Sequence, residues 1–165
     1  MDAIDEYAGR MDAPNNVRFL WFDARRLAEI FAPGEVNDLY LHFSDPWPKN
    51  RHAKRRLTHP DFLCVYHHIL SSTGALHFKT DSRRFFNYSV QQLEKCGWTI
   101  TRLTHDLYAD LPADNIATEY ERRFHRRGLA ICALDAAPPQ TAPLPLPPYG
   151  RPDAADNISP FADSE

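Results

Sequence analysis

Short apolar runs alternate with segments of helical periodicity along most of this 165-residue chain, and this alternation constrains the fold more than any other feature. Runs of about four to eight apolar residues, rich in β-branched and aromatic side chains, are typical of buried strands, whereas apolar residues three and four apart indicate a helix. Strands that alternate with helices form parallel sheets with helices packed on their faces. We therefore predict an α/β fold in which only the last strand runs antiparallel. The predicted strands are 17–22, 37–43, 75–80, 98–103 and 129–134, and helices are predicted over 24–31, from about 58 to 73, from 81 or 82 to 96, and over 118–127.

The composition changes at both ends of the chain and leaves one central domain. Residues 1–16 carry little apolar periodicity and end in the turn signal Pro14-Asn15-Asn16, so we predict an N-terminal extension there. Eight of the fourteen prolines lie between Pro138 and Pro160, where few apolar residues could form a core. We predict that residues 136–165 are a proline-rich, disordered tail. Residues 17–135 then form a single domain that is long enough to bury a core.

The net charge of −3 argues against a protein that coats nucleic acid by its bulk charge, but one short segment of the chain is strongly basic. Between Lys49 and Arg56 the chain carries five positive charges in eight residues and no acidic residue. A polyanion would therefore bind this chain at that one segment.

The composition also argues against several classes of protein. No apolar run approaches the length of a membrane span, and the acidic N-terminus lacks the features of a signal peptide. The three cysteines are widely spaced and form no C-x-x-C pair, so we expect a cytoplasmic protein without a disulfide framework or a zinc ribbon. The six glycines never form a G-x-G pair, which argues against a nucleotide site built on a glycine-rich turn of this chain.

Polar residues directly follow three of the predicted strands, and ligands of parallel α/β sheets bind beyond the carboxyl ends of strands. These residues are Asp23, the segment 44–56 and Lys79-Thr80-Asp81. The middle segment contains Asp45-Pro46-Trp47, which combines a carboxylate that accepts hydrogen bonds with a ring that stacks on a planar base. Proline restricts the backbone around both side chains.

The simpler interpretation of this sequence is an Asp-Pro turn with Trp47 packed on the core. For an isolated Asp-Pro-Trp we would prefer that interpretation. The five cations that follow favour a nucleic-acid-binding segment instead.

The sequence Asp45-Pro46-Trp47-Pro48-Lys49, followed by Arg51-His52 and Lys54-Arg55-Arg56, resembles the signature of the tRNA (guanine-N7-)-methyltransferase family. Three further pieces occur in the order of that family. They are Phe22-Asp23-Ala24 after the first predicted strand, Phe78-Lys79-Thr80-Asp81 after the third, and Thr118-Glu119-Tyr120-Glu121 near the end. The resemblance covers roughly residues 15–134, and the central motif is its specific part.

The resemblance implies a Rossmann-like class I methyltransferase sheet and an enzyme that transfers a methyl group from S-adenosylmethionine to N7 of a guanine in the variable loop of tRNA. It implies no metal ion. Asp45 is expected to be the catalytic carboxylate and, together with Asp23, to bind the methyl donor. The resemblance leaves open which carboxylate accepts hydrogen bonds from the base and which one lies next to the methyl donor. The residues expected to bind the substrate or the RNA are Lys49, Arg51, His52, Lys54, Arg55, Arg56, Asp81, Thr118 and Glu121.

The chain departs from the family where the donor site should begin. In the family, a first strand, a glycine-rich turn and a second strand closed by an acidic residue precede the segment that starts near Asn15. We therefore expect a partial sheet without its first two strands and glycine-rich loop, which a missing N-terminal half or a partner chain would complete. One alternative is a non-catalytic tRNA-binding fragment or subunit. Another is a methyltransferase that acts on exocyclic amines, which Trp47-Pro48-Lys49 and the basic segment disfavour.

Overall fold

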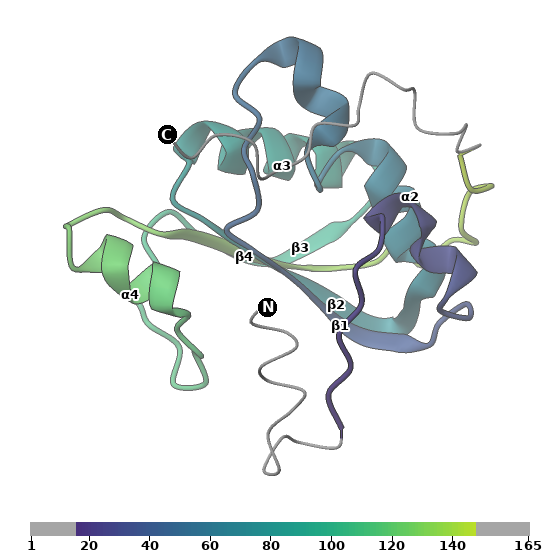
Figure 1. Cartoon of the computed structure of the whole chain (residues 1–165), viewed down its shortest axis with the longest axis horizontal. Helices are drawn as coiled ribbons and strands as arrows, with labels where there is room; N and C mark the ends of the chain where they lie inside the picture. The colour runs from purple at the N-terminus through teal and green to yellow at the C-terminus, as the bar shows by residue number, and fades with distance from the viewer. Residues whose placement is uncertain (1–15, 148–165) are drawn as a thin grey trace.

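The structure is a computed structural model that describes residues 16–147, and four strands in this part of the chain form one sheet (Figure 1). The strands are β1 (Val36–His42), β2 (Leu70–Thr80), β3 (Thr99–Thr104) and β4 (Cys132–Ala137), in the order β1-β2-β4-β3. β1 and β2 are parallel, whereas β4 runs antiparallel to both of its neighbours. The predicted α/β fold with an antiparallel last strand is confirmed.

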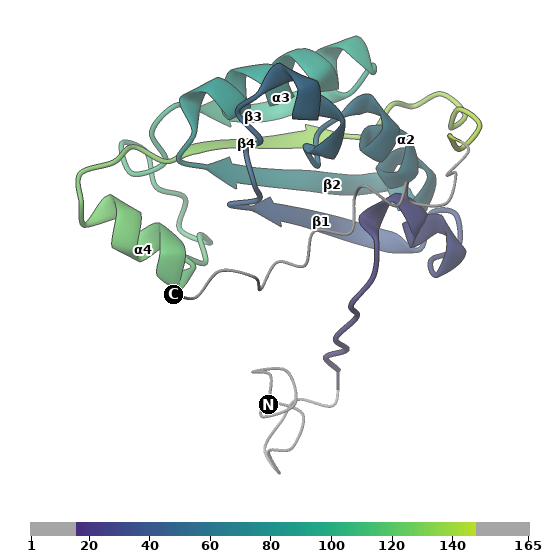
Figure 2. The same cartoon turned by 45° about the horizontal axis from the view of Figure 1, so that its top comes forward.

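Two helices cover one face of this sheet. They are α2 (Pro60–Ile69) and α3 (Arg83–Lys95), which lie above the strands in Figure 2. Two short 3-10 helices, η1 (Ala24–Glu29) and η2 (Asn50–Arg55), precede α2 in the chain, and η1 packs against α2. The last helix, α4 (Glu119–His125), lies beyond the carboxyl ends of β1 and β2 (Figure 2).

Side-chain caps mark the starts of the two covering helices. The hydroxyl of Ser82, one of the two positions where this helix is predicted to start, accepts a backbone hydrogen bond at the start of α3. The start of α2 differs from the prediction, because His59 is its cap and accepts from the Asp61 N–H. Thr58, where the predicted helix begins, is fully buried and its hydroxyl lies 2.8 Å from that of Ser89 in α3.

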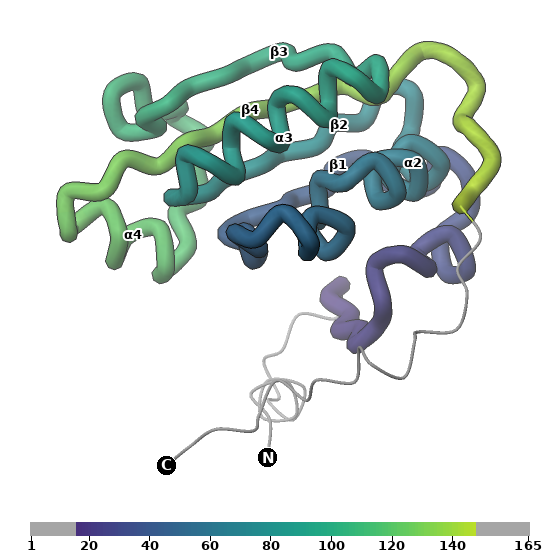
Figure 3. The backbone as a smooth tube through the Cα atoms, turned by 90° about the horizontal axis from the view of Figure 1, so that it is seen from above, coloured from purple at the N-terminus to yellow at the C-terminus, as the bar shows by residue number. Residues whose placement is uncertain are grey.

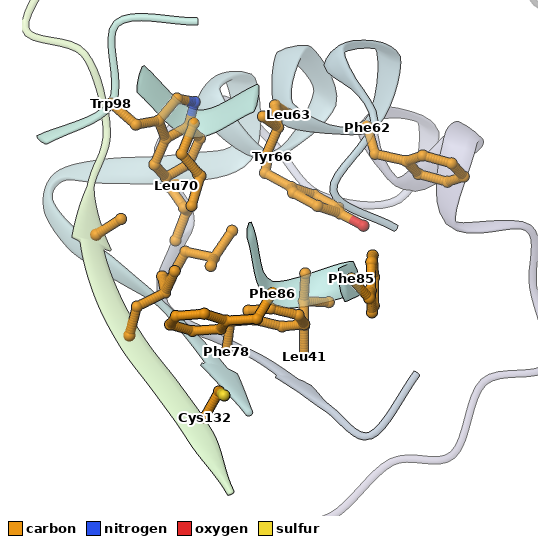
Figure 4. Close-up of a cluster of buried hydrophobic side chains, with 14 residues drawn as sticks. Leu41, Phe62, Leu63, Tyr66, Leu70, Phe78, Phe85, Phe86, Trp98 and Cys132 are labelled. Carbon is orange, nitrogen blue, oxygen red and sulfur yellow. The ribbon is translucent and has the colours of Figure 1, made fainter. Parts of the chain in front are cut away.

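The hydrophobic core fills the space between the two helices and the sheet. Phe78 of β2 contacts two rings of α3, Phe85 edge-on with ring centroids 5.2 Å apart and Phe86 at 6.1 Å. Tyr66 of α2 and Leu41 of β1 belong to the same buried cluster (Figure 4). The apolar stripes predicted for the two helices are therefore the faces that pack on the sheet.

No described helix lies across the opposite face of the sheet (Figure 2). Polar side chains cross this open face in a row, because His77 of β2 contacts Asp38 of β1 at 3.1 Å and Asp135 of β4 at 2.7 Å. Arg102 of β3 extends the row by donating to Asp135 at 2.6 Å, and Tyr40 stacks on His77. A parallel sheet buried on both faces reads as continuous apolar runs. The polar row therefore marks this face as one that meets water or polar groups.

Residues 17–22 do not form the predicted strand. The segment is irregular, and most of its apolar side chains are exposed, with Leu20 55% and Trp21 97% exposed. A strand needs a neighbour for its backbone hydrogen bonds, and within the described residues β1 pairs with β2 alone. The prediction is wrong because an apolar run does not indicate whether a partner strand is present.

β2 begins five residues before the predicted start at residue 75. Leu70 pairs with Val36, and a register shift follows before Ala75 pairs with Asp38. A Cβ atom on Gly74 would lie 2.6 Å from the Asn37 carbonyl oxygen, so the close approach of the two strands requires glycine there.

Other boundaries differ at the ends of the described region. The predicted helix 24–31 is the shorter η1, and β4 includes residues 136–137 of the predicted tail. Residues 138–147 contain no helix or strand. Residues 1–15 of the predicted N-terminal extension and residues 148–165 of the tail lie outside the described residues. Within residues 16–147, no helix is long and apolar enough to cross a membrane.

Candidate functional site

Four of the predicted site residues lie where β1 and β2 end, next to α4. The chain turns over the end of β2 after β1, because the Phe43 N–H donates to the Lys79 carbonyl oxygen at 2.9 Å. The Phe43 ring also packs on Tyr120 of α4, with ring centroids 4.7 Å apart. Two strand ends and the start of α4 are thereby brought together (Figure 1). The predicted residues on these segments are Asp45, Asp81, Thr118 and Glu121.

The segment that carries Asp45 has an unusual backbone. Phe43 and Trp47 have positive φ values of 55° and 40°, which aromatic residues rarely adopt. Such positions cost about 1–3 kcal/mol each and persist only where the surrounding structure enforces them, often at functional sites. Asp45 lies between them and is exposed. The segment therefore presents a carboxylate to solvent from a backbone that other groups must hold in place.

Arg56 differs from the other cations of segment 49–56 because it lies inside the protein. Only 5% of its surface is exposed, and its guanidinium donates to the carbonyl oxygens of Pro46 and Trp47. The guanidinium also lies over the ring of Tyr88 in α3, 4.3 Å from its centroid. All of these partners belong to the protein, although the sequence predicts an RNA contact for Arg56.

The rest of segment 49–56 lies mainly on η2 and faces outward. The guanidinium of Arg55 lies over the Trp47 ring at 5.0 Å. Partial desolvation and the neighbouring cations lower the pKa of His52, so this residue is mostly uncharged at neutral pH. Arg84 of α3 donates to Asn50 at 3.3 Å and adds a cation that the sequence analysis missed. The exposed basic residues of the segment are Lys49, Arg51 and Lys54.

A buried ion pair joins the end of β2 to α4. Lys79 Nζ lies 2.9 Å from Glu121 Oε2 and 2.7 Å from Asn115 Oδ1. The other carboxylate oxygen of Glu121 accepts from Tyr108 Oη and from Asn115 Nδ2, each at 3.1 Å. Burial raises the pKa of Glu121, but these hydrogen bonds and the charge of Lys79 outweigh it and hold the pKa below its usual value. Both oxygens of this fully buried carboxylate are therefore occupied by protein groups.

The hydroxyl of Thr118 also has its hydrogen-bond partner inside the protein. It caps α4 by accepting from the Glu121 N–H at 3.0 Å. The sequence predicts substrate contacts for both residues, and the structure gives both of them partners inside the protein. The sequence analysis places Lys79 at a strand end but assigns it no role, since its partner Glu121 lies 42 positions away along the chain.

Asp23 makes the contacts of a helix cap. Its carboxylate accepts from the Arg25 N–H at 2.9 Å and pairs with the Arg25 guanidinium at 2.8 Å. Partial burial raises the pKa of Asp23, but Arg25 outweighs this effect and lowers the pKa. The helix that Asp23 caps, η1, lies toward the end of the sheet opposite α4 (Figure 3). The structure thus does not group Asp23 with the residues next to α4.

A cavity of about 770 Å³ opens on the open face of the sheet, beside the loop that precedes α4. Its volume is that of a small-molecule site, and it adjoins the strand ends through Lys79 and Thr118. Other residues that line it include Tyr40, His77, Arg102 and Asn115. Within the described part of the chain, no group of three or more His, Cys, Asp or Glu residues could hold a metal ion.

A family model and three curated relatives both point to methyltransferases. The model of a family described as "Putative methyltransferase" matches residues 1–134. The tRNA (guanine-N(7)-)-methyltransferase of an Exiguobacterium species is 51% identical over 121 residues, which are 73% of this chain and 56% of the relative. The enzymes of the same name from Macrococcus caseolyticus and Streptococcus sanguinis are 49% and 45% identical, over 73% and 76% of this chain and 58% and 59% of their own lengths. The chain therefore spans little more than half the length of these curated relatives.

Among solved structures, one described as a "Putative DNA Modification Methylase" of Thermus thermophilus, complexed with S-adenosyl-L-methionine, is 16% identical. The match covers 81% of this chain and 55% of that one, with a TM-score of 0.43.

Proposed function

We propose that this chain, which belongs to the methyltransferase family whose model matches residues 1–134, is the substrate-binding and catalytic portion of a tRNA (guanine-N7-)-methyltransferase. The observation that carries the proposal is the 45–51% identity to three enzymes of that name over at least 121 residues. The proposed portion is residues 17–135. A cytoplasmic location belongs to the proposal, because the three widely spaced cysteines suit a reducing compartment.

The proposed chemistry suits an exposed carboxylate held in a fixed position. Guanine N7 already carries a lone pair and no proton, so its methylation needs no general base, and orientation and electrostatics remain as the sources of catalysis. Asp45 can accept hydrogen bonds from the N1–H and N2–H₂ groups of guanine, a pair of donors that adenine lacks on that edge. Its negative charge also stabilises the positive charge that the methylated ring acquires.

The RNA is proposed to meet the protein on the outer side of η2. Lys49, Arg51 and Lys54 are exposed there, and Arg84 of α3 adds a fourth cation. Exposed Lys and Arg residues bind phosphates and release condensed counterions, so the affinity would fall as the salt concentration rises. Trp47 offers a ring next to these cations for stacking on a base.

The residues of this chain fit only part of a site for the methyl donor. S-adenosylmethionine supplies the methyl group when it is bound. Asp45 lies exposed at the end of β1, where a carboxylate could face both donor and base, but the six glycines form no glycine-rich turn. We propose that an N-terminal half or a partner chain supplies the rest of the donor site. The open face of the sheet and the outer edge of β1, which has no partner strand within the described residues, support this proposal.

The test compares wild type and Asp45→Ala, each combined with the N-terminal portion of the Exiguobacterium relative. Methyl transfer to tRNA and filter binding of tRNA are measured side by side. We expect the variant to lose methyl transfer while its tRNA affinity stays nearly unchanged, because Asp45 adds negative charge rather than phosphate affinity. Equal losses of transfer and affinity would show that Asp45 is a structural residue and contradict its proposed role.

A second candidate function is a tRNA-binding module without catalysis. The observation that favours it is the absence of any G-x-G pair from a chain that keeps the basic segment 49–56. Under this alternative the chain binds tRNA, but no methyl transfer appears even with the N-terminal portion supplied. Transfer in the combined enzyme would exclude it.

A further inference from the structure

We propose that Arg56 is the positioning residue of the segment Asp45–Trp47 and does not bind RNA phosphate. The consequence of this role for methyl transfer rests on the proposed function, whereas the positioning of the segment does not. The surroundings of Arg56 differ from those of the other cations in the basic segment.

The contacts of Arg56 point toward the Asp45 segment. Its Nε atom lies 3.2 Å from the carbonyl oxygens of both Pro46 and Trp47, and its Nη2 atom lies 2.9 Å from that of Trp47. With 5% of its surface exposed, the side chain cannot reach a phosphate outside the protein without leaving these partners. Arg51 and Lys54, by contrast, are exposed on η2.

The Asp45 segment needs such a partner because it cannot support its own backbone. Pro46 and Pro48 have no N–H group to donate, so the segment cannot extend the strand ladder of β1. Trp47 has a φ of 40°, which other contacts must stabilise. A guanidinium presents several N–H donors in a fixed plane and can hold two successive carbonyl groups at once.

Arg56 is itself fixed by α2 and α3. Its backbone N–H donates to the Ala53 carbonyl and its carbonyl accepts from the His59 N–H, at the junction of η2 and α2. The ring of Tyr88 in α3 supports the face of the guanidinium at 4.3 Å. Arg56 therefore links the proposed catalytic segment to the helical layer that forms the core.

The role requires arginine rather than positive charge alone. The ammonium of a lysine is a point charge that cannot stack on Tyr88 and span two carbonyl groups in one plane. Arg56→Lys should therefore disturb the segment although it keeps the charge, whereas Lys54→Arg, which also keeps the charge at an exposed position, should leave the segment unchanged. This pair of substitutions separates positioning from charge.

The first experiment is ¹⁹F NMR of the full chain labelled with 5-fluorotryptophan, with the Trp47 resonance assigned through Trp47→Phe. We expect Arg56→Lys to move or broaden the Trp47 resonance, and Lys54→Arg to leave it in place. Trp98, which is buried in the core, reports on the fold and should keep its resonance in both variants. Tyr88→Leu, which removes the ring under the guanidinium, should also move the Trp47 resonance. An unchanged Trp47 resonance in Arg56→Lys, or equal changes at Trp47 and Trp98, would overturn the proposal.

The second experiment measures the salt dependence of tRNA binding and the kinetics of methyl transfer in the combined enzyme. Arg51→Ala and Lys54→Ala should each reduce the slope of log K against log salt by about 0.7–0.9, the value of one phosphate contact. Arg56→Gln should leave the slope unchanged and lower kcat, with KM for tRNA unaltered, by up to about 100-fold, as expected for a displaced catalytic group. A slope reduced as in Arg51→Ala would show that Arg56 is a phosphate contact. Wild type that neither binds nor methylates tRNA would contradict the proposed function and leave the NMR result to decide the role of Arg56.

Discussion

Replacing Glu121 by alanine tests how much stability its buried pair with Lys79 provides. The substitution leaves the Lys79 side chain, which is 9% exposed, without its carboxylate, and removes the acceptor of the hydrogen bonds from Tyr108 and Asn115. Removing one partner of a buried ion pair costs about 3–5 kcal/mol, because the other charge stays buried and unpaired. A domain is stabilised by about 5–15 kcal/mol in total. We therefore expect Glu121→Ala to reduce the free energy of unfolding by about 3–5 kcal/mol, a large part of the whole.

Urea unfolding followed by circular dichroism measures this change. Glu119→Ala is the matched control, since Glu119 is exposed in the same first turn of α4 and should contribute less than about 1 kcal/mol. The double variant Lys79→Met with Glu121→Leu removes both charges and should be more stable than Glu121→Ala alone. Equal losses of stability in Glu121→Ala and Glu119→Ala would refute the reasoning.

The same carboxylate makes the stability depend on pH. The pKa of Glu121 in the folded chain lies below its unfolded value of about 4.3. Its contribution is therefore fully present above about pH 4.3 and is lost as the pH falls through the folded pKa. We expect the difference in stability between wild type and Glu121→Gln to shrink as the pH is lowered from about 7 to about 3. A difference that stays constant would show that the fold does not favour the charged form.

Three further outcomes are expected. Gly74→Ala should lower the free energy of unfolding by about 1–3 kcal/mol, because its Cβ would lie 2.6 Å from the Asn37 carbonyl oxygen; a thermal melt equal to that of wild type would contradict this. Asp135→Asn should cost about 1–3 kcal/mol in urea unfolding, since it weakens the contacts with both His77 and Arg102, and a neutral result would mean that the polar row adds no stability. The chain alone should bind S-adenosylmethionine weakly in calorimetry and gain affinity when the N-terminal portion is supplied; micromolar binding by the chain alone would disprove the proposal that the donor site is completed elsewhere.

Local patterns in the sequence predict much of the fold. The strand at 37–43, the cap Ser82 and a helix near 118–127 follow from residue types within a few positions of one another. The strand predicted at 17–22 fails because pairing depends on a neighbouring strand that the pattern does not contain. Thr58 is not a cap because its hydroxyl is bonded instead to Ser89, on another helix.

The candidate site, like the fold, is predicted only in part by the sequence. The sequence points to the ends of β1 and β2, and the structure brings Asp45, Asp81 and Thr118 to that end of the sheet. The pattern of charges in segment 49–56 cannot show that one arginine of the five cations is buried, because its partners are carbonyl groups that any residue carries. Nor can it pair Lys79 with Glu121, which requires the packing of α4 against the sheet.

The outer edge of β1 has a consequence for how separate copies of the chain behave. Unpaired strand edges can recruit a strand from another molecule and start aggregation, and proteins discourage this with charged residues and bulges at the edge. β1 has the first of these features, since Asp38 is exposed on it, whereas the extra residues of the register shift lie on β2, between Leu70 and Ala75. A second β1 paired in parallel and in register would bring two Asp38 carboxylates near one another, which is unfavourable. The edge is thus a poor template for self-association while it remains available to a strand of different sequence.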